Sequence, residues 1–111
     1  MIFQSILNDF QAANNGTDAF KTLKMQCECA IQNQDNTFQY SALFLIYGFA
    51  KNYVLLYEDQ AVPSDFALKA KQQLMSYMSI LNQALTTQDA AIILQHSNQV
   101  IKHYNASSKI F

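Results

Sequence analysis

Apolar residues recur at helical spacing along most of this chain, and in one stretch they are almost continuous. That stretch is Thr37–Tyr57, TFQYSALFLIYGFAKNYVLLY, and its single charge is Lys51. A membrane span needs about 20 mostly apolar residues, whereas the uninterrupted part, Tyr40–Ala50, has 11. A lysine near the centre of a span also costs roughly 3 kcal/mol. We therefore predict a central helix that is enclosed on almost every side by the rest of the chain.

Gly48 stands in the middle of this predicted helix, where a glycine costs about 1 kcal/mol relative to alanine. Ser41, Gly48 and Asn52 fall on one thin stripe, since they are spaced at i, i+7 and i+11. We interpret the glycine as the point where a neighbouring helix approaches closely. A larger side chain at this position is then expected to overpack the protein.

Four further helices are predicted from apolar positions that share one face. They cover Met1–Ala13, Asp18–Gln32, Asp65–Leu85 and Gln88–Tyr104. The polar loop Asn33–Asn36 precedes the central helix, with Thr37 as its cap. Thr87 is the predicted cap of the last helix, and Asp89 is placed in its first turn.

The last seven residues, 105–111, follow the final predicted helix and end in Ile110-Phe111. This end either docks or frays, and fraying is the default for a chain terminus. We therefore expect a flexible tail.

The predicted fold is all-α, a single domain over residues 1–111. Only 2 glycines and 1 proline are present, too few for the frequent turns of an all-β protein. We expect a four-helix up-and-down bundle with an extra short N-terminal helix, because the short Thr86-Thr87 connection forces antiparallel neighbours.

Charge and cysteine content narrow the function classes. The 7 basic residues are all lysine, and with 8 acidic residues they give a net charge of −1. Without arginine or a basic stripe, nucleic acid is not an expected partner. No secretory signal is recognised at the N-terminus. Cys27 and Cys29 are too close for a useful disulfide, so reduced thiols and a cytoplasmic location are expected.

No pattern for catalysis, metal binding or a cofactor is found. Residues two apart on a helix point in different directions, so Cys27 and Cys29 cannot chelate one ion. His96 and His103 are seven apart, roughly 10 Å along a helix, and are expected at the surface or its boundary. No base and acid accompany a nucleophile. We predict that the protein is not an enzyme and needs neither metal nor cofactor.

Aromatic residues are concentrated on the central helix, where Phe44 and Phe49 are predicted to be core residues. Six tyrosines exceed what a core of this size requires, and tyrosine is enriched at protein interfaces. We hypothesise a partner-binding groove that receives a helix of another protein or a second copy of the chain. Its predicted lining is Tyr53, Tyr57, Met75 and Tyr77.

Two stretches, LFLIYGFAK (Leu43–Lys51) and FALKAKQQLMSYMSIL (Phe66–Leu81), resemble flagellar export chaperones. Those proteins are small helical bundles that hold an export substrate, so the resemblance implies a chaperone-like role. It covers less than half of the chain and lacks the family's acidic position inside the tyrosine motif. No site residue is therefore carried over.

These observations lead to an expected function as a small bacterial protein-interaction module, chaperone-, adaptor- or immunity-like, that acts by covering a partner's surface. The alternative is a bundle that binds a small apolar ligand in its core, between the central and fourth helices. A cavity of several hundred Å³ would favour the ligand, whereas a dense core with an exposed apolar patch would favour a protein partner.

Overall fold

The computed structural model describes residues 1–33, 35 and 38–111. In these residues the secondary structure is helical, and the predicted all-α class is confirmed. The predicted cap Thr37 and part of the predicted loop, Gln34 and Asn36, lie outside the described residues. The elements are α1 (Ile2–Ala12), α2 (Thr17–Asn33), α3 (Tyr40–Tyr57), α4 (Ser64–Thr86) and α5 (Ala90–Ala106).

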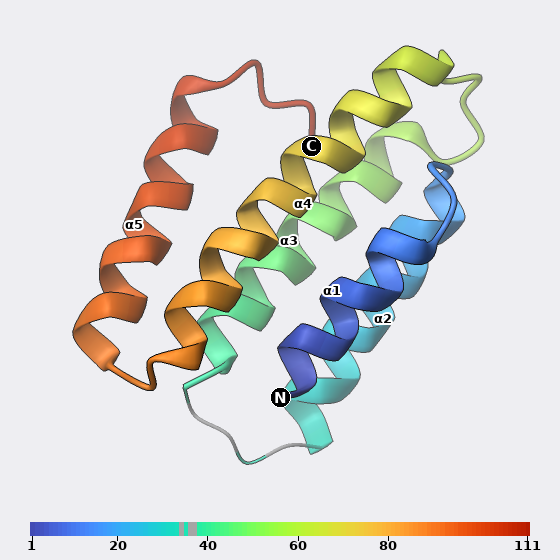
Figure 1. The fold of residues 1–111 in the computed structure, drawn as a ribbon. Helices are drawn as coiled ribbons and strands as arrows, with labels where there is room; N and C mark the ends of the chain where they lie inside the picture. The colour runs from blue at the N-terminus through green and yellow to red at the C-terminus, as the bar shows by residue number, and fades with distance from the viewer. Residues whose placement is uncertain (34, 36–37) are drawn as a thin grey trace.

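The helices form two layers with a fifth helix beside them (Figure 1). In this view α1 and α4 lie in front, α2 and α3 lie behind, and α5 stands to the left. The most extensive pairing joins α2 to α3, α1 contacts both α2 and α4, and α5 packs mainly on α4. A four-helix bundle with an extra N-terminal helix is compatible with these neighbours.

The core is centred on α3, because this helix contacts both α2 and α4. Its buried residues are Ala42, Leu43, Ile46, Phe49, Ala50, Tyr53 and Val54. The outer side of the helix is not covered: Phe44 is 64% exposed, Leu55 72% and Leu56 54%. The prediction that α3 is enclosed on almost every side is therefore wrong along that side.

A buried lysine joins α1 to α4. Lys71 is only 6% exposed, and its ammonium group donates to the carbonyl oxygens of Gln11 (3.4 Å), Asn14 (3.2 Å) and Ala13. It also lies 5.3 Å from the centre of the Phe10 ring. Gln11 lies in the last turn of α1, and Ala13 and Asn14 follow it directly. Carbonyls at a helix end lack partners within the helix, so the lysine caps α1 from a different helix. Burial lowers the pKa of the Lys71 amine.

The end of the chain docks into the core instead of fraying. Phe111 is 2% exposed, and its ring centre lies 5.2 Å from Phe49 and 6.0 Å from Tyr104. The Tyr104 hydroxyl donates to the carbonyl oxygen of Phe111. The flexible tail expected for residues 105–111 therefore differs from the structure, because the aromatic end finds a site between α3, α4 and α5.

The N-cap of α5 also differs from the prediction and lies two residues later in the sequence. Asp89 is the N-cap, and its carboxylate accepts from the backbone N–H groups of Ala91 (2.9 Å) and Ile92 (3.3 Å). Thr87 instead donates its hydroxyl back to the carbonyl of Ala84. Gln88 has a positive φ of 53°, so the turn extends past Thr87. The helix therefore begins later, and Asp89 becomes its N-cap.

Gly48 does not mark a close helix approach. A Cβ atom built at this position would meet no atom within 4 Å, and the residue is partly exposed. The prediction of overpacking is therefore wrong for the single chain. The glycine costs helix stability without an intrachain contact that explains it.

We predict that Lys71→Met lowers the free energy of unfolding by about 1–3 kcal/mol, because the carbonyls at the end of α1 lose their donor. Between the lowered folded pKa and the ordinary value of about 10.4, the unfolded state binds more protons. Wild type should therefore gain stability relative to Lys71→Met as the pH rises through that window. Urea unfolding at several pH values tests this. Exposed Lys69→Met is the control, and an equal loss in both variants contradicts the capping role.

Gly48→Ala should raise the free energy of unfolding by roughly 0.5–1 kcal/mol, since alanine has the higher helix propensity and its methyl group enters open space. The melting temperature measured by circular dichroism should increase accordingly. A decrease would show that the backbone at this position cannot accept a side chain.

Candidate functional site

The four residues predicted to line a groove fall into separate surroundings. Tyr53 is 1% exposed, and its ring stacks on Phe20 with centres 3.9 Å apart. Tyr57 is partly buried and contacts Tyr53 at 4.8 Å and Phe66 at 5.2 Å. The structure thus brings Tyr53 and Tyr57 together, within the packing of α2, α3 and α4.

Tyr77 belongs to a second aromatic cluster. It is 2% exposed, and its ring centre lies 5.6 Å from Phe49 and 6.2 Å from Phe111. Its hydroxyl accepts from the Gln73 amide at 2.8 Å and shares a 2.7 Å hydrogen bond with Nδ1 of His103. Met75 is partly buried against the core. Partner binding at these four residues therefore stays a hypothesis, and the burial of Tyr53 and Tyr77 leaves Tyr57 and Met75 as its accessible part.

An apolar groove lies elsewhere, between α3 and α5. Its volume is about 460 Å³. From α3 it is lined by Ser41, Phe44 and Leu45, and from α5 chiefly by Leu94 and Ile101. Phe44 is 64% exposed, Leu94 62% and Ile101 46%. We call this surface, the groove with these three exposed side chains, the α3/α5 face.

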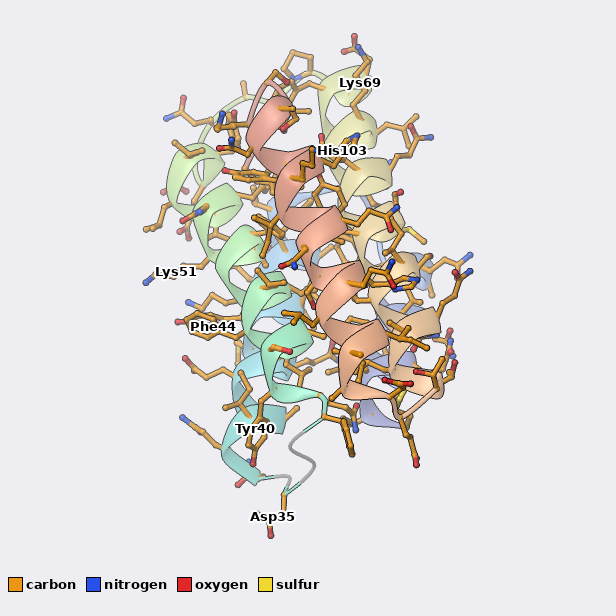
Figure 2. The ribbon with its side chains drawn as sticks, turned by 90° about the vertical axis from the view of Figure 1, so that its left-hand side faces the viewer. Asp35, Tyr40, Phe44, Lys51, Lys69 and His103 are labelled. Carbon is orange, nitrogen blue, oxygen red and sulfur yellow. The ribbon has the colours of Figure 1, made fainter. Side chains whose placement is uncertain are left out.

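Phe44 forms a ridge on this face. On its other side lies a smaller hollow of about 230 Å³, lined by Ile31 and Gln32 of α2 together with Phe44 and Tyr47 of α3. Figure 2 shows Phe44 and Lys51 on the outer side of α3, both pointing away from the bundle. The ring stacks on Tyr47 with centres 6.0 Å apart but is 64% exposed, so the prediction that Phe44 is a core residue is wrong. Phe49, at 7% exposed, is confirmed as one.

Among the residues that the structure describes, those that line the groove include no ionisable group; the polar ones are Ser41, Ser97 and Asn98. The exposed ion pair of Lys21 with Glu58 joins α2 to the residue that follows α3, away from the groove lining. A surface of this kind contributes to binding by burial of apolar area and not by long-range attraction.

Reactive side chains do not converge on the groove. Burial raises the pKa of the Cys27 thiol to about 12, which keeps it protonated and unreactive at neutral pH. Cys29 is exposed. His103 is exposed (Figure 2), and its Nδ1 atom is hydrogen-bonded to the Tyr77 hydroxyl. Within the residues that the structure describes, no three of His, Cys, Asp and Glu lie close enough together to hold a metal ion.

Comparisons with known proteins identify no relative of this chain. No family model matches the chain, and neither a curated protein nor a solved structure matches it. The resemblance to flagellar export chaperones thus gains no support from these searches. Across residues 1–33, 35 and 38–111, no helix has the length and apolar character needed to cross a bilayer.

The sequence does contain a signal for the α3/α5 face that tyrosine content does not reveal. Ile93 and Leu94 are adjacent on α5, so their side chains point about 100° apart, and both cannot be central to one interface. Ile93 is 6% exposed and Leu94 62%. The apolar stripe on α5 is wider than one neighbouring helix can cover. Such a pattern indicates that a second molecule or element contacts the helix.

We predict that Tyr53 and Tyr77 ionise at higher pH than exposed tyrosines, because burial raises the pKa of both phenols. In an absorbance titration near the phenolate band, Tyr53→Phe and Tyr77→Phe should each remove part of the late-titrating signal. The folded state keeps these protons longer, so stability should fall as the pH rises above about 10. Loss of early signal in these two variants would contradict their burial.

Proposed function

We propose that this protein is a non-enzymatic helical interaction module that binds a protein partner by burial of an apolar surface. The partner occupies the α3/α5 face, with Tyr57 and Met75 as further contacts at the predicted tyrosine-bearing surface. The protein acts in the cytoplasm by covering a segment of its partner, in the manner of a chaperone, adaptor or immunity protein. It uses neither cofactor nor metal.

The observation that carries this proposal is the exposure of Phe44, Leu94 and Ile101 around one groove. Fully burying a side chain of this kind contributes about 1.5–3 kcal/mol. Exposed apolar residues scattered singly are normal, but several around one hollow indicate an interaction site. The core, by contrast, is filled by ring-on-ring contacts such as Phe20 with Tyr53.

A small apolar ligand is the alternative occupant. The groove volume of about 460 Å³ is within the range of ligand pockets, but such pockets enclose most of their ligand. Here the side chains at the rim, Phe44 and Leu94, are more than half exposed, so one side of any small ligand would remain in water. A protein segment fits this open surface better, because the rest of the partner protein covers the side of the segment that faces away from the groove.

We predict that a photoreactive amino acid at position 94 forms a covalent adduct with a polypeptide when the protein is expressed in its source cells. The double variant Leu94→Ser/Ile101→Ser should lose the same interaction. Its free energy of unfolding should change by less than about 1 kcal/mol, because the two side chains are already 62% and 46% exposed.

The control carries the photoreactive group at Leu68 of α4, which is 44% exposed and away from the groove lining. Equal adducts at positions 68 and 94 would indicate unspecific contact. The absence of any polypeptide adduct at position 94, with adducts to small molecules only, would overturn the proposal in favour of the ligand.

A further inference from the structure

The seam between α5 and the α3/α4 pair is filled at one end and open at the other. Near the end of α5, Phe111 is buried against Phe49 and Tyr104, and Figure 1 shows the chain end lying over α4. Toward the start of α5, the same seam opens into the groove beside Leu45 and Leu94. The chain thus fills one half of the seam with a phenyl ring of its own and leaves the other half to another molecule.

Phe44 and Gly48 form a projection and a gap on one side of α3. They are four residues apart, so they share one helix face. The Phe44 ring is 64% exposed, while a side chain at Gly48 would meet nothing within 4 Å. In a dimer with a two-fold axis, a contact between residue i of the first copy and residue j of the second is repeated between residue j of the first and residue i of the second. Such an axis can place each phenyl ring over the gap of the second copy.

We propose that the partner at the α3/α5 face is a second copy of this chain. The two α3 helices pair antiparallel, and Phe44 of each copy packs over Gly48 of the other, about one helix turn from the Phe44 that borders the groove. This inference rests on the proposed function, because it uses the same apolar face. It also gives a role to Gly48 and to the Phe44 ring, which stacks on Tyr47 within one chain but is still 64% exposed.

Charge selects the antiparallel orientation. In a parallel pair each α3 residue faces its own equivalent, so Lys51 would face Lys51. With Phe44 opposite Gly48 in an antiparallel pair, Lys51 lies opposite Ser41, and the two lysines are about 15 Å apart along the helix. That separation exceeds the screening length of roughly 8 Å at physiological salt. Among the residues that the structure describes, the groove lining is uncharged and the adjoining hollow adds one carboxylate, Glu28. With a net charge of only −1, two copies approach without strong repulsion.

The surface is large enough for a dimer. The groove and the neighbouring hollow share Phe44, so α5, α3 and α2 form one continuous face. Their 17 to 18 residues correspond to about 26 Å, and three helices side by side are about 30 Å wide, which gives roughly 780 Å². A stable interface of standard size buries about 800 Å² on each partner.

Sedimentation equilibrium of the purified chain, from micromolar to submillimolar concentration, tests the inference. Wild type should dimerise. Phe44→Ser and Gly48→Leu should each raise the dissociation constant about 100-fold or more, since each variant disrupts two symmetric contacts. Leu68→Ser, which removes an exposed leucine from α4, should change it less than about 2-fold. Unchanged helix content by circular dichroism and a cooperative melting transition will show that the variants fold.

Mixed disulfides test the orientation in a Cys29→Ser background. A chain with Ser41→Cys, mixed with a chain with Lys51→Cys, should form the crossed dimer under mild oxidation, whereas neither chain alone should pair with itself. Both positions are exposed, and Phe44 and Gly48 stay intact. Preferential Lys51→Cys self-pairing would indicate a parallel arrangement and overturn the inference. A dimer that is unaffected by Phe44→Ser and Gly48→Leu would do the same.

The two proposals fail in different ways. If wild type stays monomeric at every concentration but the photoreactive group at position 94 captures a different protein, the second-copy inference is overturned and the proposed function stands. If the same group captures neither another protein nor a second copy, both are overturned. Capture of a second copy, lost in Gly48→Leu, supports both.

Discussion

A helix that is apolar almost all round needs neighbours on every side, and this chain supplies too few. α3 packs most extensively on α2 and also meets α4, which covers the side that bears Leu43, Ile46 and Tyr53. α5, the last helix available, packs mainly on α4. The outer side of α3 is therefore left in water, and the exposed Phe44 and Leu55 follow directly from that shortage.

The C-terminal end reduces this shortage without removing it. Phe111 enters the seam between α5 and the α3/α4 pair, where Phe49, Tyr77 and Tyr104 surround its ring. The hydrogen bond from Tyr104 to the Phe111 carbonyl fixes the backbone as well. One ring can fill only one end of the seam, so the groove at the start of α5 remains.

The helices themselves could be predicted from the sequence because their apolar residues keep helical spacing, and turn residues such as Pro63 separate them. The exposed side of α3 could not be predicted in the same way. When apolar residues are continuous, their spacing does not show which face of the helix is buried. The sequence pattern alone therefore does not distinguish Phe44 from Phe49. Their exposures of 64% and 7% are decided by where α2, α4 and α5 lie, which is tertiary information.

Other differences have local causes. The cap of α5 moved to Asp89 because Gln88 adopts a positive φ, a conformation that sequence alone does not assign. Phe111 was expected to fray because a terminus usually does, and only the surrounding rings reveal its site. Tyr53 and Tyr77 are predicted at a surface but are buried in the structure. The Tyr53 ring stacks on Phe20, and the Tyr77 hydroxyl is hydrogen-bonded to Gln73 and His103.

The lack of charge in the groove determines how such a surface can discriminate between partners. Charged interfaces reject wrong partners by repulsion, but a lining of Leu45, Leu94 and Ile101 with serine and asparagine has no such means. Selection must then come from shape: a ring of the right size, placed at the right distance from a gap. Phe44 and Gly48 lie about one helix turn apart on α3, and a second copy of the chain, the partner we propose, presents the same two residues in matching positions.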